Sequence, residues 1–140
     1  MGLSREKLDL KGKTVSIRLE HHPDLSIAES LPTVTGIIHS LILGRGRHPF
    51  DYAYVRLGIP LHLEGRHSTW LLLPFDKGKF SVLRERGSVW VRWVSLVLDE
   101  KFVGKYPVQR EDTRNIQEGE AFIGGWFGEV TLLDIPDVTV

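Results

Sequence analysis

The stretch from Ser88 to Leu98 constrains the fold of this chain more than any other segment. It reads SVWVRWVSLVL, in which β-branched and aromatic residues predominate, and it is bounded by Arg86-Gly87 and Asp99-Glu100. Such a run favours a pleated strand with apolar contacts on both faces. We therefore expect a strand here, at the centre of the sheet.

Shorter segments repeat this character. Val15, Ile17 and Leu19 alternate with polar residues, which is the pattern of a half-buried strand. The segment 34–43 is apolar on both sides and predicts a central or sandwiched strand, whereas 52–57 returns to alternation. Further strands are expected over 61–64, 69–75, 80–83, 121–123 and 130–135.

Turn-forming residues separate these segments. Hairpin turns are expected through 65–68, 76–79 and 85–87, and the doublet Gly124-Gly125 inside a strand pattern predicts a bulge or a tight bend. Turns at such regular spacing, without a long helical pattern, are typical of antiparallel sandwiches and barrels. We expect an all-β fold: a single antiparallel β-barrel or β-sandwich of about seven to nine strands with at most short helical turns. One domain is expected over residues 1–140.

The amino-acid composition argues against several classes of protein and of binding site. The 18 Lys and Arg residues balance 18 Asp and Glu residues, so the net charge is zero, which disfavours a dedicated nucleic-acid binder. The absence of cysteine excludes disulfides and thiolate metal sites. No segment has the apolar character of a signal peptide or of a bilayer-spanning helix. We expect a cytoplasmic protein with no membrane partner.

Motifs for catalysis are missing from the sequence. No serine lies in a Gly-x-Ser-x-Gly turn, and no glycine-rich loop has the form of a phosphate-binding loop. His62 and Glu64 would share one face of a strand, with His67 across the turn, and this group is the one alternative for a small-ligand or metal-dependent hydrolytic site. It lacks the spacing of known zinc motifs, and solvent-facing hairpin residues are the simpler interpretation. We expect no catalytic residue, no bound metal and no cofactor.

The loop at 44–49 is a candidate for binding. Arg45 and Arg47 are flanked by glycine and followed by Phe50, Tyr52 and Tyr54, so charge and stacking surface occur together. Small barrels bind single-stranded nucleic acid with this combination, which makes such binding an alternative function. The competing interpretation is an exposed loop whose tyrosines pack at a sheet edge.

The tryptophans are a second set of candidate binding residues. Trp90 and Trp93 are three residues apart, so a regular strand would place them on opposite faces, with at least one in the core. An indole left exposed beside Arg92 would suit a protein interface, because Trp, Tyr and Arg dominate interface energetics. We expect a non-catalytic binding or accessory domain that recognises a protein partner, or a second copy of itself. The candidate binding residues are Arg45, Arg47, Phe50, Tyr52, Tyr54, Arg92, Trp93 and Trp126.

Overall fold

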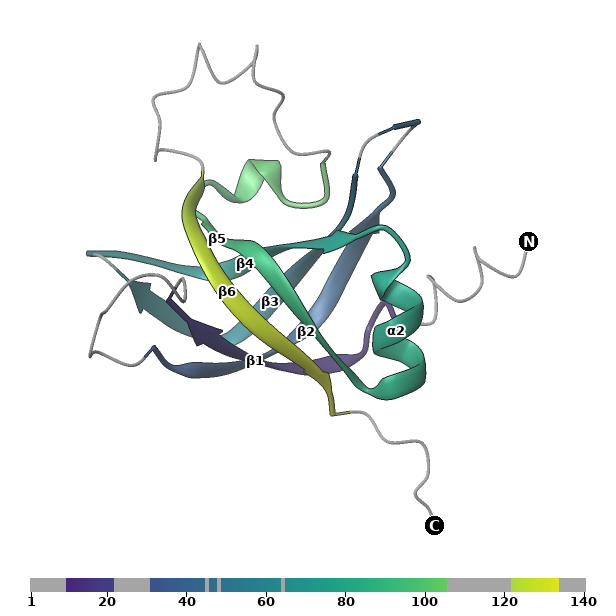
Figure 1. Ribbon diagram of the computed structural model, residues 1–140. Coiled ribbons are helices and arrows are strands. Elements are labelled where there is room, and N and C mark those ends of the chain that lie inside the picture. Colours follow the sequence, from purple (N-terminus) through teal and green to yellow (C-terminus); the bar gives the residue numbers. More distant parts are fainter. Residues whose placement is uncertain are drawn as a thin grey trace.

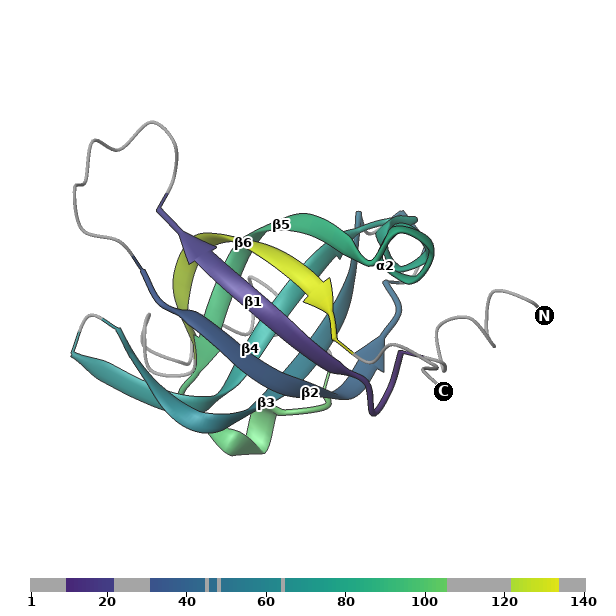
Figure 2. The same cartoon turned by 90° about the horizontal axis from the view of Figure 1, so that it is seen from below.

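Antiparallel strands close into a barrel (Figures 1 and 2). The computed structural model describes residues 10–21, 31–44, 46–47, 49–63, 65–105 and 122–133. These residues form six strands, each paired with the next along the chain, and β6 pairs with β1 to complete the barrel. The strands are β1 (Thr14–Glu20), β2 (Thr33–Ile42), β3 (Phe50–Leu63), β4 (Arg66–Asp76), β5 (Ser88–Val97) and β6 (Phe122–Leu132). The all-β antiparallel class is confirmed, and the architecture is a barrel.

The strand count is lower than expected because neighbouring segments join. The segment 52–57 and residues 61–63 of the segment 61–64 belong to the single strand β3, which passes through Gly58 and Pro60 by an irregularity between Arg56 and Leu61. Segments 121–123 and 130–135 likewise contribute to the single strand β6. Gly58 and Pro60 therefore mark an irregularity within one long strand, where the sequence predicted a strand end.

The prediction of a strand over 80–83 was wrong, because this segment lies in the helix α2 (Lys79–Arg86). Phe80 and Leu83 are three residues apart, so one helical face carries both, and both are buried in the barrel interior. Gly87 ends the helix at φ 85° and donates its N–H to the Leu83 carbonyl at 2.8 Å. Figure 1 shows α2 against one end of the barrel.

The barrel interior holds the main hydrophobic core. Alternate residues of each strand point inward, such as Val15, Ile17 and Leu19 on β1. Strand β2 buries Ile38 but leaves Ile37 52% exposed, so the expected burial of both faces was wrong for this strand. The prediction that β5 lies at the centre of the sheet was wrong, because a closed barrel has no central strand. Strand β5 lies between β4 and β6.

A second apolar cluster lies outside the barrel. Tyr52 and Tyr54 alternate with inward-facing residues of β3, so they point outward, where they pack with Trp70, Leu72 and Val97. Phe102 and Val103, in and after the short 3₁₀ helix η1 (Glu100–Phe102), cover this cluster. The segment after β5 therefore buries the outer surface of β3 and β4.

Gly36 allows β2 and β3 to approach each other closely. A Cβ atom at this position would lie 2.6 Å from both the Arg56 carbonyl oxygen and a Val55 methyl group. Real Cβ atoms do not approach backbone oxygens so closely, so a side chain would force the two strands apart. At Gly58, on the facing strand, an added Cβ would meet nothing within 4 Å.

We predict that Gly36→Ala lowers the free energy of unfolding by roughly 1–3 kcal/mol, because overpacking moves the backbone of β3. Gly58→Ala, the matched control, should change it by less than about 1 kcal/mol, with stabilisation through reduced freedom of the unfolded chain. Urea denaturation followed by tryptophan fluorescence measures both values. Equal stabilities for the two variants would contradict the close approach at Gly36.

Candidate functional site

Two compensating bulges shape the β5–β6 pair. Val91 pairs with Gly128 and Val94 with Trp126, so β5 carries one more residue than β6 between these pairs. Ser95 then pairs with Gly124, so β6 carries the extra residue in the next interval and the original register returns. The bulge predicted at Gly124-Gly125 is confirmed; the bulge on β5 was not expected. An inserted residue reverses the inward and outward alternation beyond it.

The β5 bulge places two tryptophans on the outer surface. Val89 and Val91 point inward before the bulge, and Val94 and Leu96 point inward after it. Trp90 and Trp93 therefore both face solvent, with 46% and 57% of their surface exposed. The expectation that they lie on opposite faces, with one in the core, was wrong because it assumed an unbroken alternation.

Trp93 has a backbone conformation that large residues avoid. Its φ is 66°, and it is the one non-glycine residue with positive φ among the described part of the chain. The left-handed region brings Cβ close to the backbone and disfavours L-residues by about 1–2 kcal/mol. More than half of the Trp93 surface is exposed, so this part of the side chain gains nothing from burial in the barrel. Strained residues of this kind concentrate at functional sites.

Arg18 extends the tryptophan surface across two further strands. Arg18 of β1 pairs with Glu129 of β6, and Glu129 pairs with Trp90 of β5, so the three residues form one cross-strand row. The Arg18 guanidinium donates to Glu129 at 2.8 Å, also bonds Glu20, and lies 5.1 Å from the Trp90 ring centroid. The hydrogen bond with Glu129 raises the pKa of Arg18 above its ordinary value. The guanidinium is thus held over the indole as a cation–π pair.

Arg92 completes this surface. It lies between the tryptophans in the sequence, its side chain is 55% exposed, and its guanidinium is 3.9 Å from the Asp76 carboxylate. We call the surface formed by Arg18, Trp90, Arg92 and Trp93 the β5 face. Trp126, another candidate from the sequence, is only 4% exposed and packs in the barrel interior, so it does not contribute to this face.

The tyrosines that follow the β2–β3 loop are not exposed beside Arg47. Arg47 is exposed, whereas Arg45 lies outside the described residues. Tyr52 and Tyr54 are buried, Phe50 is half-buried, and all three belong to the outer apolar cluster. A base could not stack on the two tyrosines without displacing the segment that covers them.

Asp51 is a buried residue that contacts the beginning of this loop. It accepts a hydrogen bond from the Gly44 N–H at 2.9 Å and lies 4.0 Å from the Lys77 ammonium. Lys77 donates in turn to the Gly44 carbonyl at 2.7 Å. Asp51 and Lys77 therefore tie the end of β2 to the turn after β4, which is a structural role.

The histidine pair lies at the tip of the β3–β4 hairpin. His62 pairs with His67 across the strands, and their rings are stacked with centroids 5.2 Å apart. Both are exposed, and Glu64 lies outside the described residues. Within the part of the chain that the structure describes, no group of three or more His, Asp or Glu side chains is placed to hold a metal ion.

Comparison with protein-family models, with curated proteins and with solved structures found no match to this chain. None of the described helices is long and apolar enough to cross a membrane. The site must therefore be interpreted from its own geometry.

One signal in the sequence indicates the β5 bulge. The inward-facing residues Val89, Val91, Val94 and Leu96 have spacings of two, three and two, and the spacing of three is where the extra residue is inserted. The roles of Arg18 and Glu129 have no comparable signal, because their approach to Trp90 depends on the pairing of β6 with β1.

We predict that Trp93→Gly is more stable than Trp93→Ala by roughly 1 kcal/mol. Both variants remove the indole, but only glycine adopts a positive φ without strain. Thermal and urea unfolding of the two proteins measure the difference. A Trp93→Ala variant as stable as Trp93→Gly would mean that the backbone at this position is unstrained.

A second prediction concerns Tyr54, which donates its hydroxyl to the Lys105 carbonyl at 2.9 Å. Burial, aided by the neighbouring Tyr52, raises the pKa of Tyr54 from 10.0 to about 12. The unfolded chain therefore loses this proton first, and the folded state loses stability as the pH rises from about 10 towards 12, by roughly 1–2 kcal/mol. Denaturation at neutral pH and at stepwise higher pH should show a shallower decline for Tyr54→Phe. Equal declines would show that Tyr54 titrates normally in the fold.

Proposed function

We propose that this protein is a non-catalytic binding module that recognises a protein partner through the β5 face. The observation that carries the proposal is Trp93, an exposed indole on a strained backbone. The exposed part of the indole and the positive φ do not contribute to the core, and a requirement at an interface would account for both. Trp90 is exposed on the same outer surface of β5, which enlarges the apolar area available to a partner.

The chemistry of the β5 face favours protein over nucleic acid. Arg18 already bonds Glu20 and Glu129, and Arg92 lies beside Asp76. Binding to a phosphate backbone depends on cations that are available to replace counterions. A surface of tryptophan and arginine with interspersed carboxylates instead has the composition of protein–protein hot spots.

The partner is either a different protein or a second copy of this chain. Both partners would bury the two indoles and desolvate the Arg18–Trp90 pair, which strengthens a cation–π contact. The zero net charge of the chain means that long-range repulsion does not oppose self-association. Sedimentation equilibrium distinguishes the two classes, because only self-association changes the mass of the purified protein.

The proposal is tested with Trp93→Gly and Trp90→Ser, and with Leu43→Ser as the matched control. Leu43 is also exposed, at 42%, but it follows β2 and lies outside the β5 face. Association of the wild type is measured by sedimentation equilibrium and by affinity capture from the source cell. Both tryptophan variants should weaken it at least about thirtyfold, as for a hot spot of 2 kcal/mol or more, whereas the control should not.

Two results would contradict the proposal. One is a wild-type protein that stays monomeric and retains no partner. The other is an association that survives both tryptophan substitutions, which would place the interface elsewhere on the barrel. Circular dichroism of each variant verifies that the barrel is intact.

A further inference from the structure

The pairing between β2 and β3 stops before either strand ends. The last cross-strand pair is Gly36 with Leu57, although β2 extends back to Thr33 and β3 continues to Leu63. Residues 33–35 pair with β1 on one edge, and residues 61–63 pair with β4 on one edge. Among the described residues, no strand pairs with the facing edges of these two segments. Figures 1 and 2 both show the β3–β4 hairpin diverging from β2.

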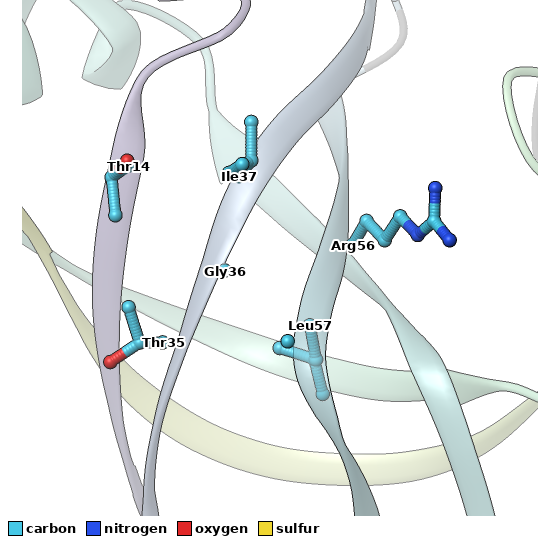
Figure 3. Close-up of a pocket in the computed structure, with 7 residues that line it drawn as sticks. Thr14, Thr35, Gly36, Ile37, Arg56 and Leu57 are labelled. Atoms are coloured by element: carbon cyan, nitrogen blue, oxygen red, sulfur yellow. The ribbon is translucent and has the colours of Figure 1, made fainter.

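An open groove lies where the strands separate (Figure 3). Its volume is about 410 Å³. Its lining includes the buried Gly36 and Leu57 and the exposed Thr35, Ile37 and Arg56, and it extends to Thr14 of β1. Gly58, on the β3 side, leaves space because it has no side chain. We call this groove the β2–β3 fork.

The main chain at the fork could form hydrogen bonds with an additional strand. An unpaired strand edge presents N–H and C=O groups that form a template for a further strand. The edge at Thr33–Thr35 is regular, whereas Gly58–Pro60 is an irregular stretch in which Pro60 has no N–H. An added strand would therefore pair with β2, and its alternate side chains would contact Ile37 and Leu57.

We propose that the β2–β3 fork binds an extended peptide segment of another protein by strand addition to β2. Main-chain hydrogen bonds supply affinity in this mode of recognition, and alternate side chains supply specificity. The proposal is independent of the β5 face, because it uses different strands and different side chains.

The side chains at the fork define the peptide. The exposed Ile37 favours apolar residues at alternate positions of the ligand. The Arg56 guanidinium lies 5.9 Å from the Trp70 ring centroid and, within the described residues, has no carboxylate partner. Figure 3 shows this side chain extending from β3 away from β2. An acidic residue at the end of the peptide that crosses β3 would pair with it.

The shape of the fork favours a single extended segment over a second copy of the barrel. Figure 2 shows the β3–β4 hairpin diverging beside β2 at this end of the barrel. A single extended segment needs less room between them than the edge strand of a second barrel. A free β3 edge would be the other route to a symmetric dimer, but its irregular stretch at Gly58–Pro60 prevents a continuous ladder.

The test is a selection from a displayed library of random linear peptides on the full chain, with counter-selection on Gly58→Trp. This substitution adds a large side chain at the groove, and Gly58 has open space around it, so the barrel is expected to fold. If Gly58→Trp does not fold, Thr35→Arg replaces it, because Thr35 is exposed at the same groove. Selected peptides are then synthesised for calorimetry.

We expect peptides with alternating apolar residues and an Asp or Glu. Their affinity should fall at least about tenfold in Gly58→Trp and severalfold in Arg56→Ala, and should be unchanged in Trp93→Gly. Bound peptide should slow amide hydrogen exchange within 33–35. N-methylation of alternate peptide amides should abolish binding, because it removes the main-chain donors.

Three results would overturn the proposal. The first is a selection that enriches no peptide over the Gly58→Trp counter-selection. The second is peptide binding without slower exchange within 33–35, which would mean that the ligand does not add a strand. The third is protection of 33–35 that rises with protein concentration in the absence of peptide, because it would identify a second copy as the occupant.

Discussion

Closure of the barrel by the β1–β6 pairing is the constraint on which the remaining structure depends. Once Val15–Glu20 pair with Phe127–Leu132, every strand has neighbours on both sides and the interior accepts side chains from one face only. A residue that does not fit this alternation must be accommodated in a bulge. The extra residue of β5 near Trp93 and that of β6 at Gly125 compensate each other, so pairing continues unchanged on both sides of them.

The β5 face is a direct consequence of this compensation. Because the bulge reverses the alternation, Val91 and Val94 both fill the interior while Trp90 and Trp93 both remain outside. The strand pairing that closes the barrel also brings Arg18 over Trp90, by way of Glu129. Apolar burial inside the barrel is large enough to support one strained residue, so a backbone that is unfavourable by itself persists at the surface.

Among the described residues, the pairing of β2 with β3 stops before either strand ends, and the β2–β3 fork arises there. Gly36 lets the strands approach closely at their last pair, and beyond it the irregular stretch of β3 leads the hairpin away from β2. The two surfaces thus have opposite chemistry. The β5 face offers tryptophan and arginine side chains, whereas the fork offers the main-chain edge of 33–35, with which no described strand pairs.

The all-β class, the alternation of β1 and of the first part of β3, and the bulge at Gly124-Gly125 could be predicted from the sequence, because these depend on local alternation and on the special conformations of glycine. The sequence did not predict α2, since Phe80 and Leu83 fit either a strand or a helix until the core supplies one buried face. The exposure of both tryptophans of β5 and the burial of Tyr52, Tyr54 and Trp126 follow from the three-dimensional fold. These outcomes depend on pairing between strands far apart in the sequence, and the pattern within one strand does not record which neighbour it will have.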